Sequence, residues 1–115
     1  MTGILVIDDD RAILNFMRLF LLQAGKFEVK TLQDSTKAYD ILRDEAFDIL
    51  LLDMDMPGVS GLDILKYIRE NNIDIMTIVL TGVEDIDLAI DAMKLGTSDY
   101  MLKPIDEDKL MSALE

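Results

Sequence analysis

The sequence predicts an α/β fold in which five parallel strands form one sheet and helices cover both of its faces. Two observations lead to this prediction. Short apolar runs alternate five times with segments whose apolar residues recur at helical spacing, and such alternation is typical of doubly wound parallel sheets with right-handed crossovers. The chain has 115 residues, of which 50% are hydrophobic, so it can form one domain around its own core.

The first strand is predicted at Ile4–Ile7, an unbroken apolar run that suits a strand buried on both faces. The helix that follows has four apolar residues at helical spacing, namely Ile13, Met17, Phe20 and Leu21. Gly25 comes next and is a residue that commonly ends a helix. Apolar and polar residues then alternate through Phe27–Leu32, which predicts a half-exposed strand at an edge of the sheet.

The middle of the chain continues the alternation. A second helix is predicted from the spacing of its apolar residues Ala38, Ile41 and Leu42. The run Ile49–Leu52 predicts another buried strand, and Pro57–Gly58 marks the loop after it. Ser60–Asp63 has the form of a helix start, because a serine and an acidic residue three positions later can cap each other.

The remaining elements follow the same logic. The third helix has the apolar residues Leu62, Leu65 and Ile68, and it is expected to end at Asn71–Asn72. Ile75–Leu80 predicts the fourth strand. The fourth helix is predicted from apolar residues at i, i+3, i+4 and i+7, which are Ile86, Ala89, Ile90 and Met93. Gly96 ends that helix, and Tyr100–Leu102 predicts a short fifth strand. A fifth helix after Pro104 is predicted from Leu110, Met111 and Leu114.

The flavodoxin-like strand order 2-1-3-4-5 fits this pattern best, because it places the amphipathic second strand at an edge. In this order the first and third strands are neighbours, and the direction of the connections reverses between them. Ligands bind at such a point, outside the carboxyl ends of the strands. We therefore expect the functional site at this end of the sheet.

Polar residues close four of the five predicted strands. The first strand is followed by Asp8, Asp9 and Asp10, and the third by Asp53, with Asp55 two positions later. The other two closing pairs are Thr81–Gly82 and Lys103–Pro104. Each residue alone is explained as a helix cap or a turn residue. Their coincidence at one rim indicates a site, in which Asp8, Asp9 and Asp53 are expected to lie closest together.

These residue types suit a divalent cation and a phosphoryl group. Clustered carboxylates repel each other, and a bound cation removes that conflict. Ligands that are all oxygen favour Mg²⁺, with Mn²⁺ as the alternative ion. An aspartate can accept a phosphoryl group as an acyl phosphate. Lys103 can neutralise charge on that group, and the Thr81 hydroxyl can donate to one of its oxygens.

The amino-acid composition excludes several classes of partner and of catalytic site. The chain has 23 acidic and 11 basic residues and a net charge of -12, so we expect no direct contact with nucleic acid and no membrane binding. Cysteine and histidine are both absent, which excludes disulfides, thiolate or imidazole zinc sites and histidine-based triads. The sequence shows no targeting segment and no apolar run of membrane length, so a cytoplasmic location is expected.

Four short motifs lie along the chain in a specific order. They are Ile-Asp-Asp-Asp at 7–10, Leu-Leu-Asp-Met-Asp-Met-Pro-Gly at 51–58, Leu-Thr-Gly at 80–82 and Tyr-Met-Leu-Lys-Pro at 100–104. Together they resemble the receiver domains of two-component response regulators, including chemotaxis regulators, over essentially the whole chain. The resemblance implies a regulatory phosphoacceptor, which is not an enzyme but promotes its own phosphorylation and dephosphorylation.

The resemblance also assigns roles to the acidic residues. Asp53 is implied to be the phosphoacceptor. Asp9 and Asp53 are implied to bind Mg²⁺ directly, Asp8 to bind it through water, and Asp55 to contribute its backbone carbonyl. The Asp55 carboxylate departs from the family pattern, because that position is variable and often neutral in receivers. It adds negative charge beside the phosphoryl site, where it can alter the lifetime of the acyl phosphate.

A two-state switch is the second implication of the resemblance. Thr81 and Lys103 are implied to contact the phosphoryl group, and Tyr100 matches an aromatic switch position that follows Thr81 inward. The surface of the fourth helix, fifth strand and fifth helix then changes. The bond before Pro104 is expected to be cis.

The partners implied are a histidine kinase or phosphotransfer protein, an output domain or effector protein, and a second copy of the chain in a homodimer formed on phosphorylation. Because the fifth helical pattern runs to the end of the sequence, we expect residues 1–115 to be a receiver domain at the N-terminal end of a longer response regulator, with a stand-alone receiver as the alternative. The stretch Ala89–Gly96 is similar to receivers of enhancer-binding transcription activators, which suggests transcription regulation as the output.

Two other functions fit parts of the sequence. Asp53-Met54-Asp55 is similar to the nucleophile motif of haloacid-dehalogenase-type phosphatases, but that motif normally lies on the first strand and precedes its metal-binding acid pair. A degenerate receiver that only binds a partner is less favoured, because no residue of the site is missing. A flavodoxin would need a Ser/Thr/Gly-rich phosphate loop where the three aspartates stand.

Overall fold

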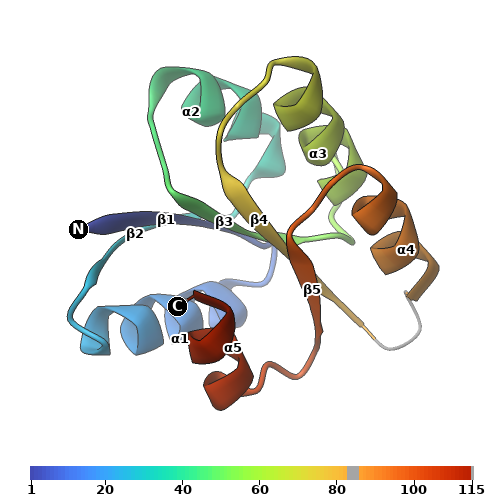
Figure 1. Ribbon diagram of the computed structural model, residues 1–115. Coiled ribbons are helices and arrows are strands. Elements are labelled where there is room, and N and C mark those ends of the chain that lie inside the picture. Colours follow the sequence, from blue (N-terminus) through green and yellow to red (C-terminus); the bar gives the residue numbers. More distant parts are fainter. Residues whose placement is uncertain (83–85, 115) are drawn as a thin grey trace.

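A five-stranded parallel sheet lies between two layers of helices in the computed structural model, which describes residues 1–82 and 86–114 (Figure 1). The strands are β1 (Thr2–Ile7), β2 (Phe27–Leu32), β3 (Ile49–Asp53), β4 (Met76–Thr81) and β5 (Asp99–Leu102). The helices are α1 (Arg11–Gln23), the 3-10 turn η1 (Ser35–Lys37), α2 (Ala38–Asp44), α3 (Gly61–Glu70), α4 (Ile86–Lys94) and α5 (Glu107–Leu114). The order β2-β1-β3-β4-β5 confirms the predicted flavodoxin-like fold.

Two apolar cores form because side chains alternate between the two faces of each central strand. Leu5 and Ile7 of β1 join the core beneath α2, α3 and α4, whereas Ile4 and Val6 join the core beneath α1 and α5. Figure 1 shows these two groups of helices on opposite faces of the sheet. The edge strand β2 exposes Glu28 and Lys30, as its alternating sequence predicts.

Helix α4 departs from the expectation set by its apolar spacing. It buries the small residues Ala89 and Ala92. Three larger apolar residues of the helix stay partly in solvent, with exposed fractions of 42% for Ile86, 49% for Ile90 and 44% for Met93. Helical spacing identifies an apolar face, but it does not reveal which residues of that face meet the sheet. The alanines allow close packing here, and the larger side chains project beside it.

Helix caps shape the loops at the carboxyl ends of the strands. Asp10 caps α1, because its Oδ1 accepts a hydrogen bond of 2.9 Å from the backbone N–H of Ala12. The predicted capping box at the start of α3 is present, with Ser60 and Asp63 each accepting a backbone N–H bond from the other. One of the three consecutive aspartates is therefore a structural cap.

Gly61 lets the first turn of α3 approach the end of β3 closely. A Cβ atom at this position would lie 2.8 Å from the carbonyl oxygen of Asp53 and 2.8 Å from Cα of Met54. Both are backbone atoms, which cannot move without displacing the strand end. Glycine is therefore needed at the point where this helix packs against the strand that carries Asp53.

We predict that Gly61→Ala lowers the free energy of unfolding by about 1–3 kcal/mol, because the added methyl group overpacks the strand end. Urea unfolding monitored by circular dichroism measures the difference. Gly3→Ala is the matched control, since its methyl group would meet nothing closer than 3.8 Å, and it should be as stable as the wild type or more so. Equal stability of wild type and Gly61→Ala would contradict the close approach.

Candidate functional site

The register of the sheet aligns the strand ends that carry the polar residues. Ile7 of β1 lies opposite Leu52 of β3, so Asp8 and Asp53 directly follow a pair of neighbours. On the other side of β3, Asp53 lies opposite Leu80, the residue before Thr81. Because parallel strands end at the same edge, these side chains meet at one rim although they are far apart in the sequence.

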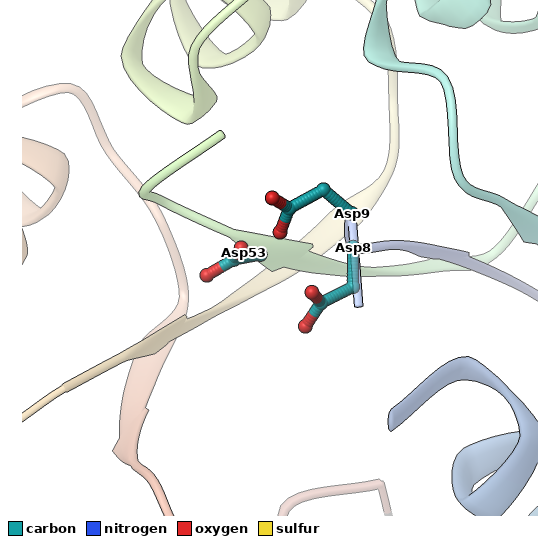
Figure 2. Close-up of side chains that lie close together, drawn as sticks. All are labelled: Asp8, Asp9 and Asp53. Carbon is teal, nitrogen blue, oxygen red and sulfur yellow. The ribbon is translucent and has the colours of Figure 1, made fainter. Parts of the chain in front are cut away.

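Three carboxylates gather at the ends of β1 and β3 (Figure 2). One carboxylate oxygen from each of Asp8, Asp9 and Asp53 lies within 4.8 Å of the others. Asp8 is fully buried and Asp53 is 4% exposed, while Asp9 is open to solvent. An oxygen-only ligand set with one open side suits a hard cation that retains water.

Lys103 connects the two buried carboxylates. Its Nζ donates to Oδ2 of Asp8 at 3.0 Å and to Oδ1 of Asp53 at 3.2 Å. The lysine follows β5 and is itself half-buried. The single positive charge of Lys103 is therefore shared between two buried carboxylates, and Asp9 adds a third carboxylate close by. Negative charge exceeds the charge of Lys103 at the cluster.

The ionisation of Asp53 reflects this excess. Burial, and after it the charge of Asp8, raise the pKa of Asp53 to about 7, although Lys103 and the backbone N–H of Asp55 offset part of the increase. Burial lowers the pKa of Lys103, but its hydrogen bonds and charge interactions with Asp8 and Asp53 outweigh this and raise the pKa above its usual value. A divalent cation at the carboxylates would stabilise the ionised form of Asp53.

The other predicted site residues lie around the cluster. Thr81 is buried, and its hydroxyl donates a long hydrogen bond of 3.4 Å to the carbonyl of Gly82. The side chain of Asp55 is exposed. Tyr100 is not part of the cluster, because it lies opposite Val79 on β4 and is 39% exposed. The Lys103–Pro104 bond is cis.

Sequence reasoning missed two residues that contact the loops of the site. The side-chain amide of Gln33 donates to the carbonyl of Asp9, and the hydroxyl of Ser35 donates to the carbonyl of Pro57. Glutamine and serine are both polar residues that are ordinary in a surface turn. No local pattern could single them out, because their partners lie 24 and 22 positions away.

The comparison with protein families agrees with this geometry. Residues 4–115 match the family described as the response regulator receiver domain. The chain belongs to this family. A receiver domain is a regulatory phosphoacceptor rather than a classical enzyme, and it works with a partner kinase and an output domain.

Similar receiver domains occur in transcriptional regulators. The chain is 35% identical over 112 residues to the transcriptional regulatory protein FixJ of Bradyrhizobium diazoefficiens, covering 97% of this chain and 54% of FixJ. It is 32% identical over 112 residues to the transcriptional regulatory protein ZraR of Escherichia coli K12, covering 97% of this chain and 25% of ZraR. The receiver chain thus spans about half or a quarter of these relatives.

Solved structures show the same fold. A response regulator receiver domain protein from Clostridium thermocellum superposes with a TM-score of 0.90 at 37% identity, covering 99% of this chain and 91% of that one. Full-length FixJ from B. japonicum gives a TM-score of 0.90 at 32% identity, covering 97% of this chain and 55% of FixJ.

The carboxylate cluster of this receiver fits a metal site. Its donors are all oxygen, two of them are buried, and their charge is only partly balanced by Lys103. Among residues 1–82 and 86–114, no helix is long and apolar enough to cross a membrane.

We predict that, without metal ions, Asp53→Asn stabilises the receiver at pH 8 but not near pH 4. The pKa of Asp53 is about 7 in the folded protein and about 4 in an unfolded chain. Between these pH values the folded state binds a proton that the unfolded state has released, so wild-type stability falls as pH rises through this window. The stabilisation expected at pH 8 is on the order of 4 kcal/mol, from a difference of about three pKa units at about 1.4 kcal/mol each.

Urea unfolding in EDTA at the two pH values measures this effect. The control is Asp74→Asn, which removes an exposed carboxylate in the turn between α3 and β4 and should shift stability about equally at both pH values. A difference between wild type and Asp53→Asn that does not change with pH would show that the pKa of Asp53 is not raised.

Proposed function

We propose that this receiver accepts a phosphoryl group on Asp53 from a histidine kinase or phosphotransfer protein, in a Mg²⁺-dependent reaction, and that phosphorylation switches a surface which controls an output domain or effector protein. The observation that carries the proposal is the position of Asp53. Its carboxylate is buried, contacts Lys103 and lies beside the carboxylates of Asp8 and Asp9. Because the chain contains no histidine, the partner supplies the phosphohistidine.

The proposed transfer is a simple displacement at phosphorus. A carboxylate oxygen of Asp53 attacks the phosphorus atom, a P–O bond forms, and the P–N bond to the donor imidazole breaks. Lys103 already contacts Asp53 at 3.2 Å, so its ammonium group can neutralise charge on the incoming phosphoryl oxygens. The Thr81 hydroxyl lies on the adjacent strand and can donate to another of these oxygens.

The proposed metal ligands are the carboxylates of Asp9 and Asp53, the Asp8 carboxylate through water, and the backbone carbonyl of Asp55. Mg²⁺ is the ion we propose, and Mn²⁺ is the alternative with the same ligand preference. When bound, the ion would neutralise charge on the phosphoryl group. The crowding of Asp8, Asp9 and Asp53 within 4.8 Å supports this assignment.

The surface proposed to respond is formed by α4, β5 and α5. Large apolar residues are exposed on its first two elements, and they are Ile86, Ile90, Met93, Tyr100 and Leu102. A groove of about 810 Å³ continues along β5 and α5. Because Thr81 lies opposite Leu102 in the sheet, movement at the phosphoryl site can reach this surface directly. We propose that an output domain, an effector or a second copy in a phosphorylation-dependent homodimer binds there.

The surrounding protein is also part of the proposal. Relatives with a similar receiver are named transcriptional regulators and are about two to four times longer than the matched segment. We propose that residues 1–115 form the N-terminal receiver of a cytoplasmic regulator of this kind. The net charge of -12 disfavours contact between this domain and nucleic acid, so DNA binding would belong to another domain.

Asp55 distinguishes the proposed receiver from a phosphatase. In a phosphatase its side chain would be a general acid or base, a role that typically contributes about 100- to 10,000-fold in rate. In a receiver only its backbone carbonyl is needed. We therefore predict that Asp55→Asn still forms a single acyl phosphate with acetyl phosphate and Mg²⁺, because asparagine retains that carbonyl.

Intact-mass spectrometry over time measures the formation and decay of this adduct. Asp53→Asn is the negative control and should form no adduct. Sustained turnover of phosphomonoesters by the wild type that is lost in Asp55→Asn would overturn the receiver assignment.

We predict that Thr81 couples phosphorylation to Tyr100. With Mg²⁺ and beryllofluoride, which mimics an acyl phosphate, Tyr100 should move from its 39% exposed position to a buried one. Fluorotyrosine NMR can follow this movement, since the chain has only three tyrosines. Thr81→Ala should abolish the shift but leave Asp53 able to accept a phosphoryl group. Thr31→Ala, a half-buried threonine of β2 at the opposite edge of the sheet from β5, serves as control, and an unmoved Tyr100 in the wild type would refute the coupling.

A further inference from the structure

The segment 33–36, which follows β2 and includes the first two residues of η1, contacts both loops that carry proposed metal ligands, although it supplies no ligand itself. At one end, Nε2 of Gln33 donates to the carbonyl oxygen of Asp9 at 3.2 Å. At the other end, Oγ of Ser35 donates to the carbonyl oxygen of Pro57 at 3.1 Å. The first contact holds the loop after β1, and the second holds the loop after β3.

The contact between Ser35 and Pro57 is not a consequence of strand pairing. In the sheet β1 lies between β2 and β3, so the loops after β2 and β3 do not follow neighbouring strands. The segment 33–36 therefore reaches across the end of β1. It leaves the sheet where the backbone N–H of Asp8 donates to the carbonyl of Leu32 at 3.2 Å, which ties its start to the site as well.

The segment 33–36 packs tightly against the loop after β3. Ser35 is only 3% exposed although it lies in a turn. A Cβ atom at Gly58, whose φ is +80°, would lie 3.2 Å from Cγ2 of Thr36. Met56 is buried in the same apolar cluster as Ala38, the first residue of α2. The loop after β3 is thus fixed by hydrogen bonding on one side and by apolar contact beneath.

We propose that residues 33–36 are a brace that sets the separation of the two ligand-bearing loops, with Gln33 and Ser35 as positioning residues for the metal ion. The proposal rests on the Mg²⁺ site of the proposed function. Gln33 bonds the main chain of the proposed ligand Asp9, and Ser35 bonds the main chain two residues after Asp55. Mg²⁺ requires near-octahedral ligands at about 2.0–2.1 Å, so a small displacement of either loop weakens binding.

The first test is a titration of the receiver with MgCl2, followed by ¹H–¹⁵N NMR. Ser35→Ala and Gln33→Met each remove one brace hydrogen bond with little change in volume. Residues that orient metal ligands typically change affinity about 10- to 100-fold. We expect a loss of roughly 10-fold for the buried Ser35 and, because water can replace part of the exposed contact, roughly 3-fold for Gln33.

Thr97→Val is the matched control for a general loss of stability. Thr97 is also buried, and its hydroxyl lies 2.8 Å from that of Thr77 and donates to the Thr77 carbonyl at 3.0 Å. It lies before β5, at the opposite end of the sheet from the carboxylates. Thr97→Val should therefore lower stability while leaving Mg²⁺ affinity unchanged.

A second measurement separates positioning from phosphoryl chemistry. We expect the Mg²⁺ concentration for half-maximal phosphorylation by acetyl phosphate to rise in the two brace variants by the same factors as the dissociation constant. The maximal rate at saturating Mg²⁺ should stay within about twofold of wild type, because the brace variants leave Asp53, Thr81 and Lys103 in place.

The outcomes distinguish the brace from the proposed function. Wild-type Mg²⁺ affinity in both brace variants, or an equal loss in Thr97→Val, would overturn the brace while the metal site stands. If wild type and Asp9→Asn give the same response to Mg²⁺, the proposed metal site itself fails. Gln33 is exposed, so Gln33→Met decides the question even if Ser35→Ala does not fold.

Discussion

The structure depends on a conflict between charge and burial at the end of β1 and β3. Asp8 and Asp53 are both buried, and Lys103 contacts both of their carboxylates. Burial and the charge of Asp8 raise the pKa of Asp53 to about 7, so ionisation of this carboxylate is unfavourable in the folded protein. Such a group gains most from a cation or from conversion into an acyl phosphate. The electrostatic conflict that lowers the stability of the protein would therefore be relieved by the proposed cation.

The parallel sheet fixes the positions of these charged side chains. Strand register places Asp8 and Asp53 directly after the paired residues Ile7 and Leu52. It also places Asp53 opposite Leu80, the residue before Thr81. Close packing of α3 at Gly61 fixes the end of β3 from the other side, and the brace at 33–36 links the loops after β1 and β3. Because strand pairing, helix packing and the two side-chain hydrogen bonds of the brace all act on the main chain of the site loops, the scaffold sets the positions of the site residues.

The surface proposed to respond is separated by β4 from β3, the strand that ends in the proposed acceptor Asp53. Helix α4 packs through Ala89 and Ala92, which leaves its larger apolar residues exposed beside β5. An exposed apolar face of this kind is costly in an isolated domain and typical of a surface that binds a partner. Thr81 pairs with Leu102 of that face. The site and the surface are therefore connected through the hydrogen bonds between β4 and β5.

The sequence by itself determined the order and type of the elements, because the spacing of apolar residues is a local property. It also placed Asp53, Thr81 and Lys103 at one rim, since parallel strands end on the same edge. Tertiary structure alone decided which of the adjacent residues Asp8 and Asp9 is buried, and that Lys103 contacts an aspartate 95 positions away. It also decided the contacts of 33–36 and the exposed face of α4. These features depend on distances between segments that are remote in sequence, and such distances become fixed only when the helices pack on the sheet.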